Sequence, residues 1–155
     1  MLLRVHTISG VIFDGSVERV EIPTKSWLIG ILPHHNPLTT IVSPGILRLL
    51  PTQKRGSEFL EGTEFLFEDE RIAIAIGDGV CYTDGQAVML FVASATTNPQ
   101  NDEQVLQEMK QKLETQIQQI RSEWDYEEIE RAYLHLQKLT ADLKLLKIKE
   151  KSSKK

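Results

Sequence analysis

Two hydrophobic periods divide this chain near Asn98-Pro99. Before that point, apolar residues take every second position in short runs, which is typical of half-buried β-strands. After it, apolar residues recur at steps of three and four, which is typical of amphipathic helices. The pattern predicts a β domain over residues 1–97, a helical pair over residues 98–149, and a basic tail over residues 150–155 that we expect to be disordered.

The β part is predicted to be an antiparallel β-sandwich. Its short apolar runs are separated by glycine and proline, which mark turns. No connection between successive runs is long enough for the helical crossover that parallel neighbours need, so hairpins are expected. Two facing sheets would bury one face of each strand. The expected strands cover residues 3–7, 16–22, 28–32, 39–42, 46–50, 65–67, 72–76 and 88–92.

The last of these strands is apolar on both sides. Val88, Leu90 and Val92 share one face, whereas Met89 and Phe91 share the other. Such a strand is either buried on both faces, or its outer face meets another protein. The sequence leaves both interpretations open.

The helical part is predicted to be an antiparallel hairpin. Asn101 with Gln104 three residues later resembles an N-cap and its reciprocal partner at the start of the first helix. Trp124-Asp125 interrupts the helical period, and Asp125 with Glu128 opens the second helix in the same way. Two helices joined by so short a connection pack side by side. The first stripe consists of Leu106, Met109, Leu113, Ile117 and Ile120.

The second apolar stripe is longer than the first. It consists of Ile129, Ala132, Tyr133, Leu136, Leu139, Leu143 and Leu146. Each fully buried side chain contributes about 1.5–3 kcal/mol. We expect this to hold the two helices together or to fix them to the sandwich, but not to do both strongly. Helices of this length are marginal in water without tertiary contacts, so a hairpin that changes partners is physically reasonable beside the default of a static one.

The charge is distributed unevenly along the chain. The formal net charge of -4 gives no global case for nucleic-acid binding. From Lys138 to Lys155 there are seven lysines against Asp142 and Glu150, a local charge of +5 that leaves -9 for the rest. The C-terminal end therefore suits an acidic partner, while a solubilising tail is the plainer interpretation of its last residues.

Three features of the sequence indicate where in the cell the protein is expected and how it relates to membranes. Cys81 is the single cysteine, so an internal disulfide is excluded and a reducing compartment is expected. The start, Met1-Leu2-Leu3-Arg4, is not followed by the apolar run of a signal peptide. The longest apolar run, Ala87 to Ala95, is far shorter than the roughly 20 residues that span a bilayer. We expect any membrane role to come through partners.

No catalytic, cofactor-binding or metal-binding residues are predicted. His34 and His35 are adjacent, so on a strand they point to opposite faces, and turn geometry or partner contact explains them better than a metal does. Gly77-Asp78-Gly79 lacks the Lys-Ser/Thr of a phosphate loop and indicates a hairpin turn. Cys81 falls in a strand pattern, and Glu127-Glu128 stand at a helix start, where the helix dipole accounts for them.

Three motifs in order resemble those of a known family. The first consists of Phe13, Gly15, Val17, Val20 and Pro23; the second of Gly30, Ile31, Leu32, Pro33, His35, Pro37 and Leu38; the third of Pro44, Gly45, Ile46 and Leu47. Together with the order of sandwich and hairpin, they resemble the epsilon subunit of the rotary F-type ATP synthases.

The resemblance implies a non-catalytic subunit of the central stalk without a cofactor. One face of the sandwich would grip the gamma subunit, and the bottom would rest on the membrane ring of c subunits. The hairpin would face the alpha/beta catalytic head, either folded on the sandwich or extended along gamma, where it blocks ATP hydrolysis. The resemblance also implies a peripheral place at the cytoplasmic face of the bacterial inner membrane.

The resemblance also yields expected contact residues. His34, His35, Asn36 and Pro37 are expected at partner contacts, as are Lys144, Lys147 and Lys149, which suit an acidic segment of a catalytic subunit. Trp27-Leu28 replaces the Gly-Glu usual in the family, which favours an apolar contact with the ring over a charged one.

Two alternatives remain beside the stalk subunit. Some family members bind ATP in the folded hairpin through Ile/Leu-Asp-x-x-Arg-Ala, of which only Arg131 and Ala132 match. A nucleotide-sensing module near Arg131 is therefore one alternative, and an unrelated adaptor that bridges other proteins is the other. The sequence decides neither the dominant state of the hairpin nor the coupling ion.

Overall fold

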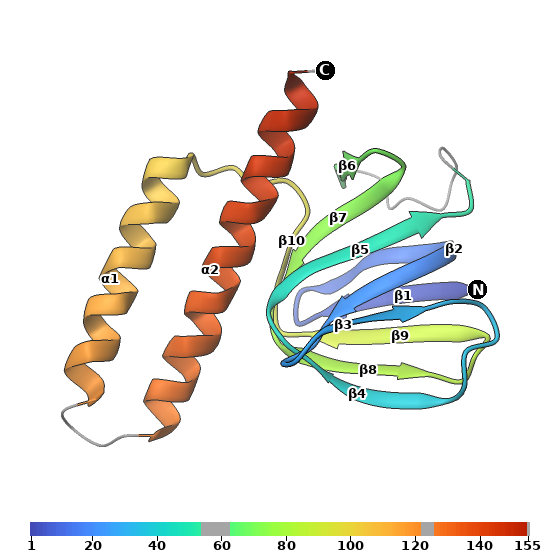
Figure 1. The fold of residues 1–155 in the computed structure, drawn as a ribbon, viewed down its shortest axis with the longest axis horizontal. Coiled ribbons are helices and arrows are strands. Elements are labelled where there is room, and N and C mark those ends of the chain that lie inside the picture. The colour runs from blue at the N-terminus through green and yellow to red at the C-terminus, as the bar shows by residue number, and fades with distance from the viewer. Residues whose placement is uncertain (54–62, 122–125, 155) are drawn as a thin grey trace.

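The computed structural model describes residues 1–53, 63–121 and 126–154, which form a β-sandwich followed by two helices (Figure 1). The predicted fold class is confirmed. The elements in chain order are β1 (Leu2–Thr7), β2 (Gly10–Pro23), β3 (Leu28–Ile31), β4 (Leu38–Val42), β5 (Gly45–Pro51), β6 (Leu66–Glu68), β7 (Arg71–Ile76), β8 (Gly79–Thr83), β9 (Ala87–Val92), β10 (Ala95–Thr96), α1 (Glu103–Arg121) and α2 (Tyr126–Ser153).

The long strand β2 links the two sheets of the sandwich. Its residues 10–16 pair with β1, and its residues 17–23 pair with β3 and β5. We call the layer of β1, β9, β8 and β4 sheet A, and the layer of β3, β5, β7, β6 and β10 sheet B. The register shift between Val17 and Arg19 lies where β2 passes from sheet A to sheet B.

One strand pair differs from the predicted antiparallel arrangement. β1 lies parallel to β9, with Leu3 opposite Val88 and Val5 opposite Leu90. Short connections exclude parallel pairing only between successive strands, whereas β1 and β9 are joined through all the strands between them. That path is long enough to return the chain in the same direction, so no crossover helix is needed.

The core of the sandwich is built from inward-facing alternate residues. Its largest fully buried side chains include Phe13, Leu47 and Ile74. In β9, Val88, Leu90 and Val92 are buried, whereas Phe91 is 51% exposed. The strand therefore has an open outer face, so burial of both its faces within this chain is excluded, and contact of the outer face with another protein stays a prediction.

Cys81 is fully buried in the same core. Desolvation by burial raises the pKa of its thiol from 9.0 to about 12. The thiolate is the nucleophilic form of cysteine, so this residue stays inert at neutral pH.

The N-cap of the first helix lies one residue later than predicted. Asp102, and not Asn101, caps α1, since its Oδ1 accepts a hydrogen bond from the Val105 backbone N–H at 2.9 Å. Leu106, Leu113 and Ile117 pack against α2 as expected, but Met109 is 41% exposed and lies off the stripe. The Ile120 side chain and the predicted break and cap at Trp124-Asp125 lie outside the described residues.

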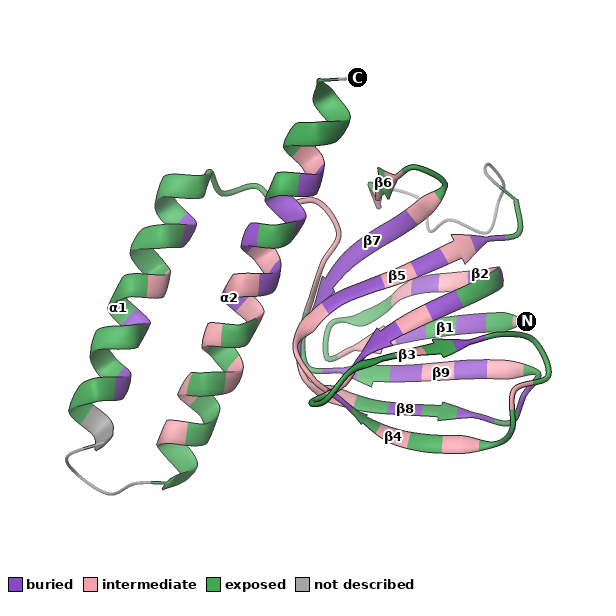
Figure 2. Ribbon diagram, viewed as in Figure 1, coloured by how far each residue is buried: buried purple, intermediate pink, exposed green. Residues whose placement is uncertain are grey.

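Helix α2 has two apolar faces, and the single stripe predicted for it is incomplete. Leu139, Leu143 and Leu146 pack on α1. On another side of the helix, Ala141, Leu145 and Ile148 pack on Ile46, Ala73 and Ala75 of β5 and β7. Figure 2 shows these buried positions in the C-terminal half of the helix. Because separate faces serve the two contacts, α2 joins α1 and the sandwich at the same time.

The C-terminal end of α2 also differs from the prediction. Residues 150–153 continue the helix, where the sequence predicted a disordered tail. Ser152 Oγ donates a hydrogen bond to the Phe67 carbonyl of β6 at 2.9 Å. The end of the helix is thereby attached to sheet B.

Candidate functional site

The described residues contain no obvious catalytic centre. No group of three or more His, Cys, Asp and Glu side chains among them is placed to hold a metal ion. No helix within these residues combines the length and apolar character needed to cross a membrane. The candidate functional sites are surfaces and cavities on the sandwich and along α2.

The outer face of sheet A carries a continuous apolar row. The strand register places Ile41 opposite Val80, Val80 opposite Phe91, and Phe91 opposite His6. Ile41 is 75% exposed, and Val80 and Phe91 are also exposed. The His6 ring stacks on the Phe91 ring, with centroids 4.8 Å apart and planes 11° from parallel.

A second row runs beside the first on the same face. Tyr82 lies opposite Met89, and Met89 lies opposite Arg4. Arg4 ends this row in an ion pair, with its Nη2 at 2.9 Å from Asp14 Oδ2. We call the two rows together, with their apolar centre and charged rim, the sheet-A face. An exposed apolar patch with a polar rim is the usual form of a protein-binding surface.

Only part of the sheet-A face was predicted from the sequence. The two-sided pattern of β9 was visible, but Ile41, Val80 and Tyr82 were not among the predicted residues. Short apolar runs at residues 38–42 and 79–83 were the available signal, and they do not say which strands become neighbours. The face exists because β4, β8, β9 and β1 lie side by side (Figure 1).

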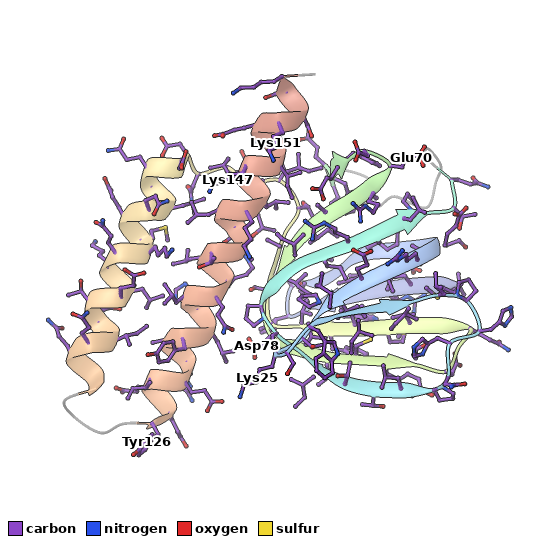
Figure 3. The ribbon with its side chains drawn as sticks, viewed as in Figure 1. Lys25, Glu70, Asp78, Tyr126, Lys147 and Lys151 are labelled. Carbon is purple, nitrogen blue, oxygen red and sulfur yellow. The ribbon has the colours of Figure 1, made fainter. Side chains whose placement is uncertain are left out.

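Trp27 and Leu28 form an exposed apolar corner where β3 begins. They are 68% and 54% exposed, respectively. Thr24 holds the preceding turn, since its backbone N–H and its hydroxyl both donate hydrogen bonds to the Trp27 carbonyl, at 2.9 and 2.6 Å. This turn lies at the end of the sandwich that faces α2, where Figure 3 labels Lys25.

The loop of His34, His35, Asn36 and Pro37 lies beyond the other end of β3, so the structure does not bring it together with Trp27. His34 has a positive φ of 66°, and its backbone N–H donates to the Gly85 carbonyl at 2.9 Å. His35 Nδ1 is 2.7 Å from the Asn36 carbonyl oxygen. The histidines thus shape a turn that packs on the β8–β9 connection.

The three predicted lysines of α2 differ in their surroundings. Lys144 and Lys147 are exposed. Lys149 is half-buried, and its Nζ donates a hydrogen bond to the Pro99 carbonyl at 3.0 Å. It therefore ties α2 to the segment before α1 and is not free for a partner in this arrangement.

Lys138 forms two contacts that were not predicted from the sequence. Lys138 Nζ lies 2.7 Å from Asp142 Oδ1, and it donates a hydrogen bond to Thr96 Oγ1 at 2.9 Å. Both charged side chains are largely buried. The spacing of four residues was a visible signal for the ion pair, but the contact with Thr96 depends on how α2 docks.

Arg131 lies at a cavity of about 290 Å³ between α2 and the sandwich. Asp78, Ser94, His135 and Lys138 also line it. Asp78 brings a negative charge, and Lys138 is already paired with Asp142. The cavity is placed where the nucleotide alternative requires one, but its charges are largely balanced.

Comparison with known proteins yields one family. The family described as ATP synthase, Delta/Epsilon chain, beta-sandwich domain matches residues 1–98. The ATP synthase epsilon chain of Chloroflexus aggregans is 40% identical over 53 residues, which span 34% of this chain and only 38% of that relative. The ATP synthase epsilon chain of Janthinobacterium sp. is 29% identical over 126 residues, 80% of each chain.

A solved structure extends the likeness of fold to the hairpin. It is the mitochondrial ATP synthase of Euglena gracilis, described as OSCP/F1/c-ring in rotational state 1. One chain of it aligns with 93% of this chain and 79% of its own length, with a TM-score of 0.64 and 17% identity.

Proposed function

This chain belongs to the ATP synthase delta/epsilon family, and from that premise we propose that it is the central-stalk epsilon subunit, coupling rotation of gamma and the c ring to ATP synthesis. As an epsilon chain, it is a non-catalytic subunit of the complex. We infer a peripheral location at the cytoplasmic face of a bacterial inner membrane. The family match removes the alternative of an unrelated adaptor.

The sheet-A face is the observation that carries this proposal. Ile41, Val80 and Phe91 lie in one row on this face and are exposed, so a partner that covers them would bury apolar side chains. We assign this face to the gamma subunit. The rigid core behind it would transmit torque, because a close-packed sandwich deforms little under load.

The remaining surfaces are assigned to the other partners. Trp27 and Leu28 are proposed to face the c ring, in an apolar contact, and the loop of residues 34–37 is proposed as a separate contact with a neighbouring subunit. Lys144 and Lys147 are proposed to meet the alpha/beta head when the hairpin extends. Lys149 would first have to leave the Pro99 carbonyl.

Replacing Phe91 with glutamate is expected to weaken gamma binding by at least about 30-fold, because the central aromatic side chains of an interface contribute about 2 kcal/mol or more. The measurement is the dissociation constant of the full chain with purified gamma. Val105→Glu is the matched control, since Val105 is also exposed but lies on α1. Equal losses in both variants, or none in the Phe91 variant, would remove gamma from the sheet-A face.

Truncation after Asn98 is expected to leave a folded sandwich and to raise the ATPase activity of the assembled enzyme severalfold. The sandwich retains its own core of buried residues without the helices. The measurement is steady-state ATP hydrolysis by complexes with the full or the truncated chain. Unchanged activity would mean that the hairpin of this chain is structural only.

A further inference from the structure

A cleft of about 300 Å³ lies where α2 crosses the turns at one end of the sandwich. The β2–β3 turn contributes Lys25, and the β4–β5 turn contributes Ser43. Helix α2 contributes Gln137 and Lys144, which are two helical turns apart and share one face. We call this site the α2 cleft.

The α2 cleft differs in charge from the other cavities along α2. The cavity at the end of α2 combines Lys151 and Lys154 with Glu68 and Asp69. The cavity at Arg131 likewise includes Asp78. Among the described residues that line the α2 cleft, by contrast, there are two lysines and no carboxylate.

Four polar side chains of the α2 cleft, those of Lys25, Ser43, Gln137 and Lys144, have no partner among the described residues, whereas the hydroxyls of Thr24 and Thr140 donate to backbone carbonyls. Neither Lys25 nor Lys144 forms an ion pair within the described part of the chain, unlike Lys138 on the same helix. No hydrogen bond of the Ser43 hydroxyl or the Gln137 amide occurs within that part either. Two ammonium groups, a hydroxyl and an amide are all hydrogen-bond donors, and together they complement an oxyanion.

We propose that the α2 cleft binds a phosphate-bearing small anion between Lys25 and Lys144. Lysine binds phosphate as a point charge and imposes no fixed orientation, which fits a site without arginine. The volume accommodates a phosphate or diphosphate group and leaves a nucleoside outside. Free phosphate and the phosphate tail of a nucleotide share this chemistry. The site is distinct from the nucleotide alternative at Arg131, which lines another cavity.

The anion would also hold the hairpin in place. Lys25 belongs to the sandwich and Lys144 to α2, so the complete site exists only while α2 is docked. A ligand that binds only the docked arrangement stabilises it by mass action. Phosphate would therefore shift the hairpin toward the docked state. This inference concerns the isolated chain and does not rest on the stalk function.

The test is calorimetric titration of the full chain with inorganic phosphate, pyrophosphate and ATP at constant ionic strength. Lys25→Gln and Lys144→Gln are each expected to weaken anion binding about tenfold or more, because each removes one of the two ammonium groups that would contact the anion. Lys147→Gln is the matched control, since Lys147 is an exposed lysine of the same helix outside the cleft. Hydrogen exchange of the α2 amides over residues 141–148 should slow with anion in the unmodified chain and in the Lys147→Gln control, but not in the Lys25→Gln and Lys144→Gln variants.

If phosphate binds and both Lys25→Gln and Lys144→Gln weaken it, free phosphate is a ligand of the cleft. If ATP binds more tightly than phosphate and the same two variants weaken it, the phosphate tail of a nucleotide is the ligand. Either result supports the site. The absence of binding at millimolar anion would overturn it. An equal loss of anion affinity in Lys147→Gln would show that the anion is attracted by the overall positive charge of α2 and is not bound in the cleft. ATP binding that survives the Lys25/Lys144 double substitution and disappears with Arg131→Gln would place the ligand in the other cavity.

Discussion

Replacing Gly79 with alanine is expected to lower the free energy of unfolding of the sandwich by about 3 kcal/mol or more. A Cβ at this position would lie 1.9 Å from the Phe91 carbonyl oxygen and 2.8 Å from the Val92 Cα. Both atoms belong to the backbone of β9, so no side chain can move aside. Gly79 also pairs with Val42 on its other side, and a shift of β8 would disturb two ladders.

Urea denaturation followed by circular dichroism measures this effect. Gly30→Ala is the matched control, because its Cβ would meet only the flexible Arg19 side chain, at an ordinary 3.6 Å. We expect the control to change stability by no more than about 1 kcal/mol. If the Gly79 variant had the same free energy of unfolding as the control, β8 and β9 would not lie as close together as described at this position.

Replacing Leu145 with alanine is expected to release α2 from the sandwich. Leu145 is fully buried and packs among Ile46, Ala73 and Ala75 on sheet B and its own neighbours on α2. Loss of a buried leucine costs about 2–5 kcal/mol, and this contact is much smaller than the sandwich core. The loss should therefore fall on the docking of the hairpin and leave the sandwich folded.

Hydrogen exchange measured for individual peptides distinguishes release of the hairpin from unfolding of the whole chain. In the Leu145 variant, amides of the hairpin should exchange faster, while those of β1, β2 and β5 should keep their protection. Lys147→Ala, an exposed position two residues along the same helix, should alter neither. Uniform loss of protection across the whole chain would show that hairpin and sandwich unfold as one unit.

The docked hairpin is held by a small apolar contact and a few polar ties. Lys138 joins Asp142 and Thr96, Lys149 reaches the Pro99 carbonyl, and Ser152 reaches the Phe67 carbonyl. A single hydrogen bond contributes about 0.5–1.5 kcal/mol. Such a contact is strong enough to define one arrangement and weak enough for a partner to replace. This balance is what the proposed regulation of ATP hydrolysis requires.

The sequence alone determined the two parts of this protein, sandwich then hairpin, and most of their elements, although no range was predicted for the strands β8 and β10. Periods of two and of three to four residues predicted the sandwich and the hairpin because burial of one face repeats with the local geometry of strand and helix. The glycines of Gly77-Asp78-Gly79 marked the end of a strand, but the hairpin predicted there was wrong, because β7 pairs within sheet B and β8 within sheet A. The motifs at residues 13–23 and 30–38 also sufficed to predict the family.

Only the tertiary structure decided which elements meet. The parallel pair of β1 and β9, the second apolar face of α2, and the tie from Lys149 to Pro99 each join residues far apart in the chain. The sheet-A face and the α2 cleft likewise combine residues from several elements. Local periodicity records whether a residue is buried, but not which partner buries it. That choice depends on the path of the whole chain, which is why these surfaces could not be read from the sequence.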